Sequence, residues 1–203
     1  MESDEALRYP PGSLVVFTGL PGAGKSTLLT RLYGLTGDES EPVAAGRVRV
    51  IDSRQSRNRW AGRLVWAPKP VRTFVVYVGH VTRIGRELAA GHAVVAHNRG
   101  AWPHVLHGFA WLARRRGRPF HLILLDVEPR TALAGQHARG RVVPAATFDR
   151  HSRRWRRLVA QVRGGSPGPA ASATILDRAA ADALRALVFD DMTAVGAPHG
   201  PVE

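Results

Sequence analysis

The feature that most constrains this chain is a glycine-rich octapeptide that lies between an apolar segment and an amphipathic one. Residues 13–18 form a short, nearly continuous apolar run, which is typical of a strand buried on both faces of a parallel sheet. Residues 27–32 follow with the apolar spacing of a helix. Between them, residues 19–26 match the phosphate-binding pattern G-x-x-x-x-G-K-[ST] at every fixed position. This order of strand, turn and helix predicts an α/β domain that binds phosphate groups.

The composition of the octapeptide indicates how it would hold its ligand. Glycines let backbone N–H groups turn inward, and the helix that follows points its positive end at the same place. Lys25 is expected to meet the outer phosphates of a nucleotide, and the Ser26 hydroxyl to coordinate Mg²⁺. The residues predicted to bind the nucleotide here are Gly19, Leu20, Pro21, Gly22, Ala23, Gly24, Lys25, Ser26 and Thr27.

The rest of the pattern alternates apolar runs with helical segments. Further strands are expected at residues 48–52, 93–96, 120–126 and 173–176. Helices are expected at residues 53–60, with Ser53 as N-cap, and at 73–90, 103–116, 129–137, 145–162 and 179–189. This alternation predicts a three-layer α/β sandwich around a mostly parallel, five-stranded sheet. We divide the chain into an N-terminal extension (1–12), one domain (13–190) and a C-terminal tail (191–203).

The amino-acid composition limits the partners, the chemistry and the location that this chain can have. The 203 residues carry 29 Lys+Arg against 16 Asp+Glu, a formal net charge of +13. Such a charge attracts nucleic acid, nucleotides or anionic membranes, although a genome rich in arginine codons also explains it. The chain has no cysteine, which excludes disulfides, Cys-ligated metals and thiol nucleophiles and suits a cytoplasmic location. Its start is acidic and its apolar runs are short, so we expect neither a secretory signal nor a membrane partner.

The segment Gly-Leu-Pro-Gly-Ala-Gly-Lys-Ser-Thr at 19–27 resembles the loop of polynucleotide-kinase-like and zeta-toxin-like P-loop phosphotransferases, and the similarity extends over most of residues 13–162. The segment Ile-Asp-Ser-Arg-Gln-Ser at 51–56 resembles the one that follows the second strand in phage-type polynucleotide kinase. The resemblance implies that Asp52 takes the proton from the acceptor hydroxyl and that Arg54 or Arg57 contacts the acceptor. Alignment on Arg-Gln-Ser, however, places Ile51 at the position of that base.

A second stretch, residues 136–144, resembles the lid of this family, which ends in Val-Pro before a helix. We place a small lid at about residues 137–144. The resemblance implies that Arg139 contacts the phosphoryl group during transfer, with Arg141 as the alternative arginine and as a nucleotide contact. A mobile cationic loop that closes over a triphosphate would neutralise its charge and exclude water.

The chain departs from the family at the end of the third predicted strand. The family commonly has an Asp there, whereas this sequence has His97, Asn98 and Arg99. Mg²⁺ would then be held by Ser26, phosphate oxygens, waters and Asp52. His97 and Arg99 would line the acceptor pocket, or they mark a chain that binds nucleotide but transfers poorly. Elsewhere, Asp126 is expected to be structural, and Trp102 and Trp111 to pack in the core.

These observations predict an enzyme that moves the γ-phosphoryl group of ATP, with GTP as an alternative donor, to a hydroxyl group in the presence of Mg²⁺. The expected acceptor is a small molecule, such as a nucleotide sugar or natural product. The 5′-hydroxyl of a polynucleotide is the alternative, because the arginine-rich segment 145–162 favours nucleic acid. A nucleotide-dependent regulatory or binding module is the competing class. The sequence makes no prediction of the oligomeric state.

Overall fold

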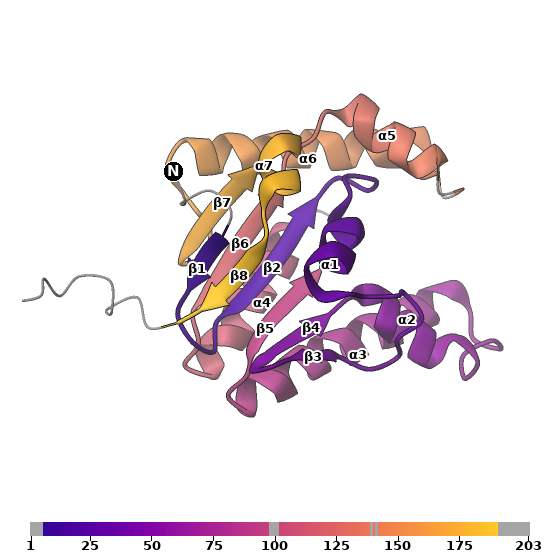
Figure 1. The fold of residues 1–203 in the computed structure, drawn as a ribbon. Coiled ribbons are helices and arrows are strands. Elements are labelled where there is room, and N and C mark those ends of the chain that lie inside the picture. The colour runs from indigo at the N-terminus through magenta and orange to yellow at the C-terminus, as the bar shows by residue number, and fades with distance from the viewer. Residues whose placement is uncertain (1–5, 98–101, 139, 141, 191–203) are drawn as a thin grey trace, which may run out of the picture.

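The computed structural model describes residues 6–97, 102–138, 140 and 142–190. Its centre is a six-stranded sheet, which can be followed in Figure 1. Five strands run parallel: β2 (Leu14–Gly19), β4 (Val48–Ile51), β5 (Ala93–His97), β6 (Phe120–Leu125) and β7 (Ser172–Leu176). With the short strand β3 (Val43–Ala45), the order across the sheet is β3-β4-β5-β2-β6-β7. β2 therefore lies between β5 and β6, in the middle of the sheet.

The central strands form because their side chains are apolar on both faces. Every residue of β2 is buried, and so is every residue of β5 and β6. Strands of this kind occur in parallel sheets that helices cover on both sides. The α/β class and the mostly parallel sheet predicted from the sequence are thus confirmed.

The sheet has one strand more than the five that we predicted. β3 pairs with β4 in the antiparallel direction, through a turn in which Gly46 has a φ of 59°. It has three residues, of which two are exposed, so it lacks the buried apolar run that identified the other strands. An exposed strand at a sheet edge leaves no hydrophobic signal in the sequence.

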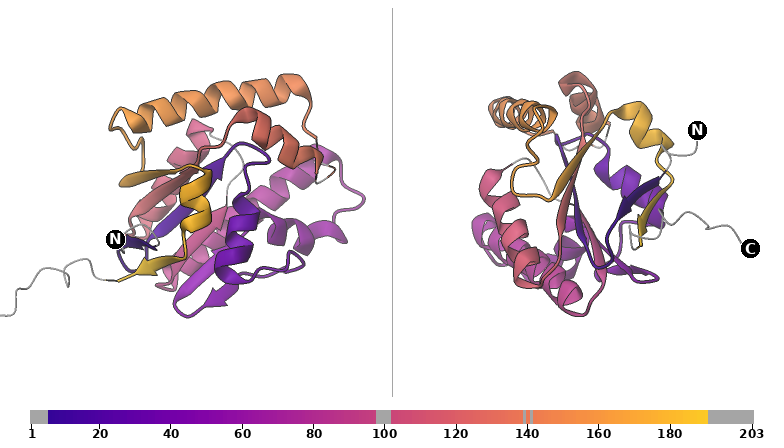
Figure 2. Two further views of the ribbon diagram at one scale, coloured as in Figure 1. Left: turned by 45° about the horizontal axis from the view of Figure 1, so that its top comes forward. Right: turned by 90° about the vertical axis from the view of Figure 1, so that its left-hand side faces the viewer.

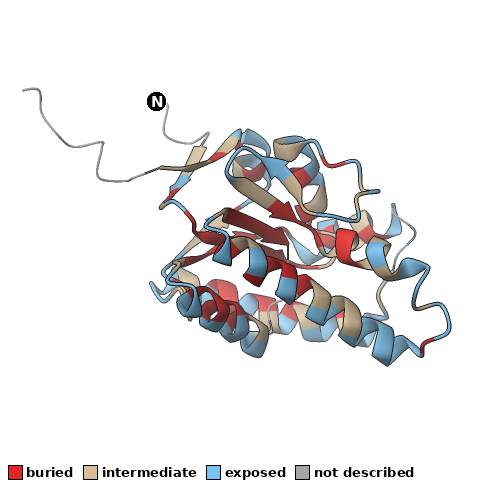
Figure 3. Cartoon of the chain, turned by 90° about the horizontal axis from the view of Figure 1, so that it is seen from below, coloured by how far each residue is buried: buried red, intermediate tan, exposed pale blue. Residues whose placement is uncertain are grey.

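Seven helices of the described residues pack around the sheet. They are α1 (Lys25–Tyr33), α2 (Ser53–Ala61), α3 (Lys69–Ala89), α4 (Pro103–Arg115), α5 (Pro129–His137), α6 (Ala145–Arg163) and α7 (Arg178–Ala183). Figure 2 shows α3 and α4 on one face of the sheet and α1 and α7 on the other, which gives the predicted three layers. The burial pattern in Figure 3 follows these layers, with the strands inside and the outer helix faces exposed.

A separate two-stranded parallel sheet joins segments from the two ends of the described chain. β1 (Ala6–Tyr9) pairs with β8 (Ala186–Phe189). The first of these strands lies within the expected N-terminal extension, and the second corrects our prediction of a helix over 179–189. The helix ends at Ala183. The Arg31 guanidinium of α1 caps this end, because it donates a hydrogen bond of 2.9 Å to the carbonyl oxygen of Leu184. The predicted tail, 191–203, lies outside the described residues.

Within the described residues, no helix is both long enough and apolar enough to span a membrane.

Candidate functional site

The glycine-rich loop lies at the carboxyl end of the central strand β2 and leads directly into α1. The neighbours of β2 are the strands that precede α4 and α5, so the loop lies where the strand order reverses, the usual ligand position in open α/β sheets. Gly22 and Gly24 both have a φ of 94°, a region that favours glycine. A Cβ added at Gly22 would also lie 1.9 Å from the Ala132 carbonyl oxygen of α5. Glycine is therefore required both for the turn and for the contact with α5.

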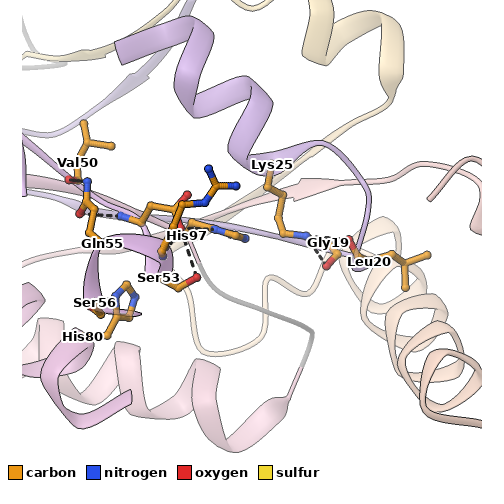
Figure 4. A network of polar contacts seen from close by, with 11 residues as sticks. Gly19, Leu20, Lys25, Val50, Ser53, Gln55, Ser56, His80 and His97 are labelled. Carbon is orange, nitrogen blue, oxygen red and sulfur yellow. Dashed lines mark hydrogen bonds and ion pairs between the residues drawn. The ribbon is translucent and has the colours of Figure 1, made fainter. Parts of the chain in front are cut away.

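The side chain of Lys25 contacts the backbone at the start of this loop. Its side chain is buried, and its Nζ donates hydrogen bonds of 2.8 Å to the carbonyl oxygens of Gly19 and Leu20 (Figure 4). The ammonium group is thereby held at the loop, where it also lines a pocket. A positive charge fixed at a glycine-rich loop, directly before the N-terminus of a helix, is an arrangement suited to phosphate.

The pocket above the loop has a volume of about 570 Å³, within the range of small-molecule sites. Its wall combines the loop with residues from the end of β5, from α2 and from the α5–α6 region. The lining residues are Gly19, Pro21, Gly22, Gly24, Lys25, Ser26, Arg54, Arg57, His97, Gly135, Gln136, Val142, Val143 and His151. Six of the residues predicted for the loop, together with three predicted acceptor contacts, thus face one cavity.

Asp52 follows β4 and begins α2. Its Oδ1 accepts a hydrogen bond of 2.7 Å from Arg54 N, while its own N donates to Gln55 Oε1 at 3.1 Å, which completes a capping box. We predicted Ser53 as the N-cap, and this was wrong by one residue because either side chain suits that position. The capping contacts fix the direction of a carboxylate that is itself buried.

His97, at the end of β5, lies against this carboxylate. Its Nδ1 is 3.2 Å from Asp52 Oδ1. Because an ionised carboxylate only accepts, this hydrogen bond requires the proton to be on Nδ1. Burial by itself would raise the pKa of Asp52, but hydrogen bonds from His97, Arg54 N and Ser26, with the charge of His97, hold that pKa well below its usual range. Asp52 is therefore ionised at neutral pH and contacts the predicted magnesium ligand Ser26.

Behind this pair lies a second buried imidazole, His80 of α3. Its Nδ1 is 3.5 Å from the Ser56 hydroxyl of α2 (Figure 4). Burial lowers the pKa of His80 to about 4, with a smaller contribution from the charge of His97. The imidazole is accordingly neutral at neutral pH. No pattern in the sequence had singled out this residue.

Gln136 is another residue that the sequence reasoning missed. It is buried at the end of α5; its Nε2 donates to the Pro21 carbonyl oxygen at 2.9 Å, and its Oε1 accepts from Val143 N at 2.9 Å. One side chain thus joins the glycine-rich loop to the segment predicted as the lid. The sequence signal that could have identified Gln136 is its residue type. An uncharged side chain that both donates and accepts hydrogen bonds stands at the start of the segment predicted as the lid.

The remaining predicted site residues divide into two groups. Arg54 and Arg57 line the pocket from α2. Arg99, Arg139 and Arg141 lie outside the described residues, so their predicted contacts with acceptor and nucleotide stay predictions.

Three predictions about tryptophan and aspartate side chains near the site have mixed outcomes. Asp126 is structural, as expected, because it accepts hydrogen bonds from Trp155 Nε1 at 3.0 Å and from Arg163 at 2.9 Å, which attach α6 to the end of β6. Trp111 is 53% exposed and does not pack in the core. Trp102 is half-buried and lies under the Arg154 guanidinium at 3.6 Å. Helical spacing alone did not show which helix face meets the sheet.

The oxygen atoms at the site fit a Mg²⁺ ion that is bound jointly by the protein and by substrate phosphates, and not one held by protein side chains alone. Ser26 and Asp52 supply a hydroxyl and a carboxylate that touch each other. Among the described residues, no group of three or more His, Asp or Glu side chains is placed to hold a metal ion. Mg²⁺ commonly keeps several waters and binds through one or two protein oxygens together with substrate phosphates, and this donor set suits that mode.

The fold and the loop together define a P-loop protein with a kinase-like α/β domain. Residues 14–162 match the AAA_33 family, described as an AAA domain. The chain belongs to this family.

Solved structures with the same architecture include kinases. A gluconokinase from Sinorhizobium meliloti 1021 has a TM-score of 0.50 at 16% identity, over 87% of this chain and 90% of that one. A chain of the Pnkp1/Rnl/Hen1 RNA repair complex has a TM-score of 0.59 at 13% identity, over 75% of this chain and 47% of that one. At such low identity these likenesses establish the fold.

A curated relative is the aliphatic sulfonates import ATP-binding protein SsuB 1 of Pseudomonas fluorescens. It is 33% identical over 131 residues, which are 63% of this chain and 48% of that protein. The chain thus spans about half the length of this relative.

Proposed function

We propose that the protein is an ATP-dependent phosphotransferase that moves the γ-phosphoryl group to a hydroxyl group of a small acceptor molecule. The observation that carries this proposal is the shared pocket, in which the loop with Lys25 faces the end of β5 and the start of α2. The cavity is thus lined both by the donor loop and by His97, which contacts the buried, ionised Asp52, and direct transfer requires two substrates bound this close to each other.

The residues have distinct roles in this proposal. Lys25 and the loop amides hold the β- and γ-phosphates, and Asp52 orients the acceptor hydroxyl and receives its proton. The hydroxyl oxygen forms a bond to the γ-phosphorus while the bond from that phosphorus to the β–γ bridging oxygen breaks, which releases ADP. Mg²⁺, when bound beside Ser26, supplies charge neutralisation of the phosphates. Arg139 would add positive charge from the lid.

His97 gives the carboxylate its orientation in this scheme. Its hydrogen bond to Asp52 Oδ1, with those from Arg54 N and Ser53, occupies that oxygen and fixes the rotamer of the side chain. A low pKa weakens Asp52 as a base, so its main contribution is to position the hydroxyl and to take the proton late in the reaction. Catalysis then rests on positioning and charge, as is general for phosphoryl transfer.

The acceptor is proposed to be a small molecule, with a nucleotide sugar or natural product as examples. The 5′-hydroxyl of a polynucleotide is the alternative acceptor. We retain it because a chain of an RNA repair complex has the same fold. ATP is the proposed donor, supported by the ATP-binding relative, and GTP is the alternative.

The test of this proposal measures transfer and nucleotide binding separately. Lys25→Ala should reduce transfer from γ-labelled ATP by about 10²- to 10³-fold, because it removes a charge from the developing transition state. Asp52→Asn retains a good N-cap and should lower transfer far more than ATP affinity. Arg114→Ala and Asp38→Asn, at exposed positions, are the matched controls. Unchanged turnover in Lys25→Ala would refute the assignment.

A second function, a nucleotide-dependent regulatory or binding module, is favoured by one observation. β5 ends in His97 and not in the acidic residue that the resembling kinases commonly have, so the site holds one carboxylate fewer for the metal. In this case ATP would bind without transfer. The test offers γ-labelled ATP together with a panel of nucleosides, oligonucleotides and nucleotide sugars. Hydrolysis of the ATP with no transfer of label to any of these acceptors would favour the module over the kinase.

A further inference from the structure

A second cavity, of about 870 Å³, adjoins the nucleotide pocket. Arg57 and His97 line both cavities, so the two share a wall at the end of β5 and the start of α2. The inference that follows rests on the proposed function, since it assigns this second cavity to the acceptor. Its volume is that of a site for one small molecule and not for a folded partner.

The cavity is formed by three helix faces. Residues at helical spacing from α2 and α3 face each other, and the start of α4 closes the end. The lining residues are Ser53, Arg57, Trp60, Ala61, Leu64, Lys69, Arg72, Thr73, Val76, Tyr77, His80, His97, Trp102, His104 and Val105. Aromatic rings come from all three helices or their caps, which gives the walls flat apolar surfaces.

One of these rings is held firmly in place. The Arg154 guanidinium of α6 lies 3.6 Å from the centre of the Trp102 ring, and His151 meets the same ring edge-on at 6.1 Å. Both partners cover Trp102 from the α6 side. A ring fixed in this way offers a stacking surface at little entropic cost to the molecule that it binds.

The charge of the lining is of one sign. Arg57, Lys69 and Arg72 are its charged side chains, and no Asp or Glu lines the cavity within the described residues. A cationic ligand would thus meet only positive charge, whereas an anionic group would be attracted to it. A polyol would place many hydroxyls against aromatic and aliphatic walls, and polar groups buried without partners are costly.

From this lining we infer that the acceptor is a hydroxyl-bearing molecule with a flat aromatic body and an anionic group, bound between the rings of α2, α3 and Trp102. The aromatic body stacks on the rings, and the anionic group meets Lys69 and Arg72 at the first turn of α3. The hydroxyl then points to the shared wall, where His97 holds Asp52. Cationic polyols of the aminoglycoside kind and simple sugars are disfavoured by the same argument.

The test uses 1-anilinonaphthalene-8-sulfonate, an aromatic anion, as the probe, and 9-aminoacridine as an aromatic cation of similar size. Binding is followed by fluorescence in the absence of nucleotide. The anion should bind more tightly than the cation. Thr73→Glu brings a carboxylate into the lining and should weaken binding of the anion about fivefold and strengthen that of the cation. Val71→Glu adds the same charge to the same helix outside the lining, and should change neither by as much.

A second control addresses the exposed apolar surface nearby. Trp66 is 80% exposed and does not line the cavity, so Trp66→Ala should leave the affinity for the sulfonate unchanged. Equal effects of Thr73→Glu and Val71→Glu, tighter binding of the cation, or loss of binding in Trp66→Ala would each overturn the inference.

The two proposals fail in different ways. Sulfonate binding that follows these expectations, combined with no transfer from γ-labelled ATP to any acceptor, would refute the phosphotransferase and keep the cavity's preference. Transfer to a simple sugar or an aminoglycoside, with no preference for aromatic anions, would keep the phosphotransferase and refute the inferred acceptor.

Discussion

The burial of the His80 imidazole predicts that the protein loses stability in mild acid. This imidazole is 4% exposed, and burial lowers its pKa from 6.5 to about 4 in the folded protein. The unfolded chain therefore binds more protons than the folded one between these values, and stability falls as the pH falls through this range. The contribution is fully present above pH 6.5. Between pH 7.5 and pH 5 the shift corresponds to a loss of about 2 kcal/mol in the free energy of unfolding.

The measurement is urea denaturation at pH 7.5 and pH 5 for the natural protein and for His80→Asn. The asparagine lacks a group that titrates in this range, so its stability should change by about 2 kcal/mol less between the two pH values. His107→Asn removes an exposed imidazole of α4 and serves as the control. His80→Gln provides a second replacement in case the asparagine variant is too unstable to measure. Equal acid sensitivity in the natural protein and in either His80 variant would refute the reasoning.

Two further predictions concern the glycine-rich loop. Gly22→Ala should cost about 3 kcal/mol or more, because it combines a positive φ with a Cβ placed 1.9 Å from the Ala132 carbonyl oxygen; Gly34→Ala has a positive φ but open space, so thermal denaturation should show a loss of about 1 kcal/mol. Gln136→Leu should cost about 2 kcal/mol and weaken ATP binding in calorimetry, because it leaves the Pro21 carbonyl and Val143 N–H without their partner. Gln161→Leu, at an exposed position of α6, should do neither, and similar losses in both variants would contradict the role given to Gln136.

The parts of the fold that were predictable are those whose residues have a strong local reason for their structure. β2, β5 and β6 are buried on both faces, so their sequences are continuous apolar runs. The helix predicted over 73–90 is confirmed by α3, which begins four residues earlier. The β-branched residues of this segment favour a strand by propensity, but the chain needs a crossover before β5, and a helix provides it.

The strands that were missed depend on their partners more than on their own residues. β1 pairs with β8 from the other end of the described chain, and β3 pairs with the nearby β4. The apolar run of β8 is short and follows a helical segment directly, so it was predicted as part of that helix. In the site, Asp52 was recognised by resemblance although the spacing was off by one residue. Gln136, in contrast, contacts a loop far away in the chain, and His80 contacts a neighbouring helix. Such contacts exist after folding and leave no periodic signal.

The pairing of β1 with β8 has a consequence for how the protein forms. Ala6 lies opposite Ala186, so this small sheet closes a loop that contains the entire central sheet. During synthesis, β1 must wait until residues 186–189 have left the ribosome before its partner strand exists. The pairing therefore follows the synthesis of every strand of the central sheet, and a nascent chain arrested before residue 186 would expose the backbone edge of residues 6–9 to other strands.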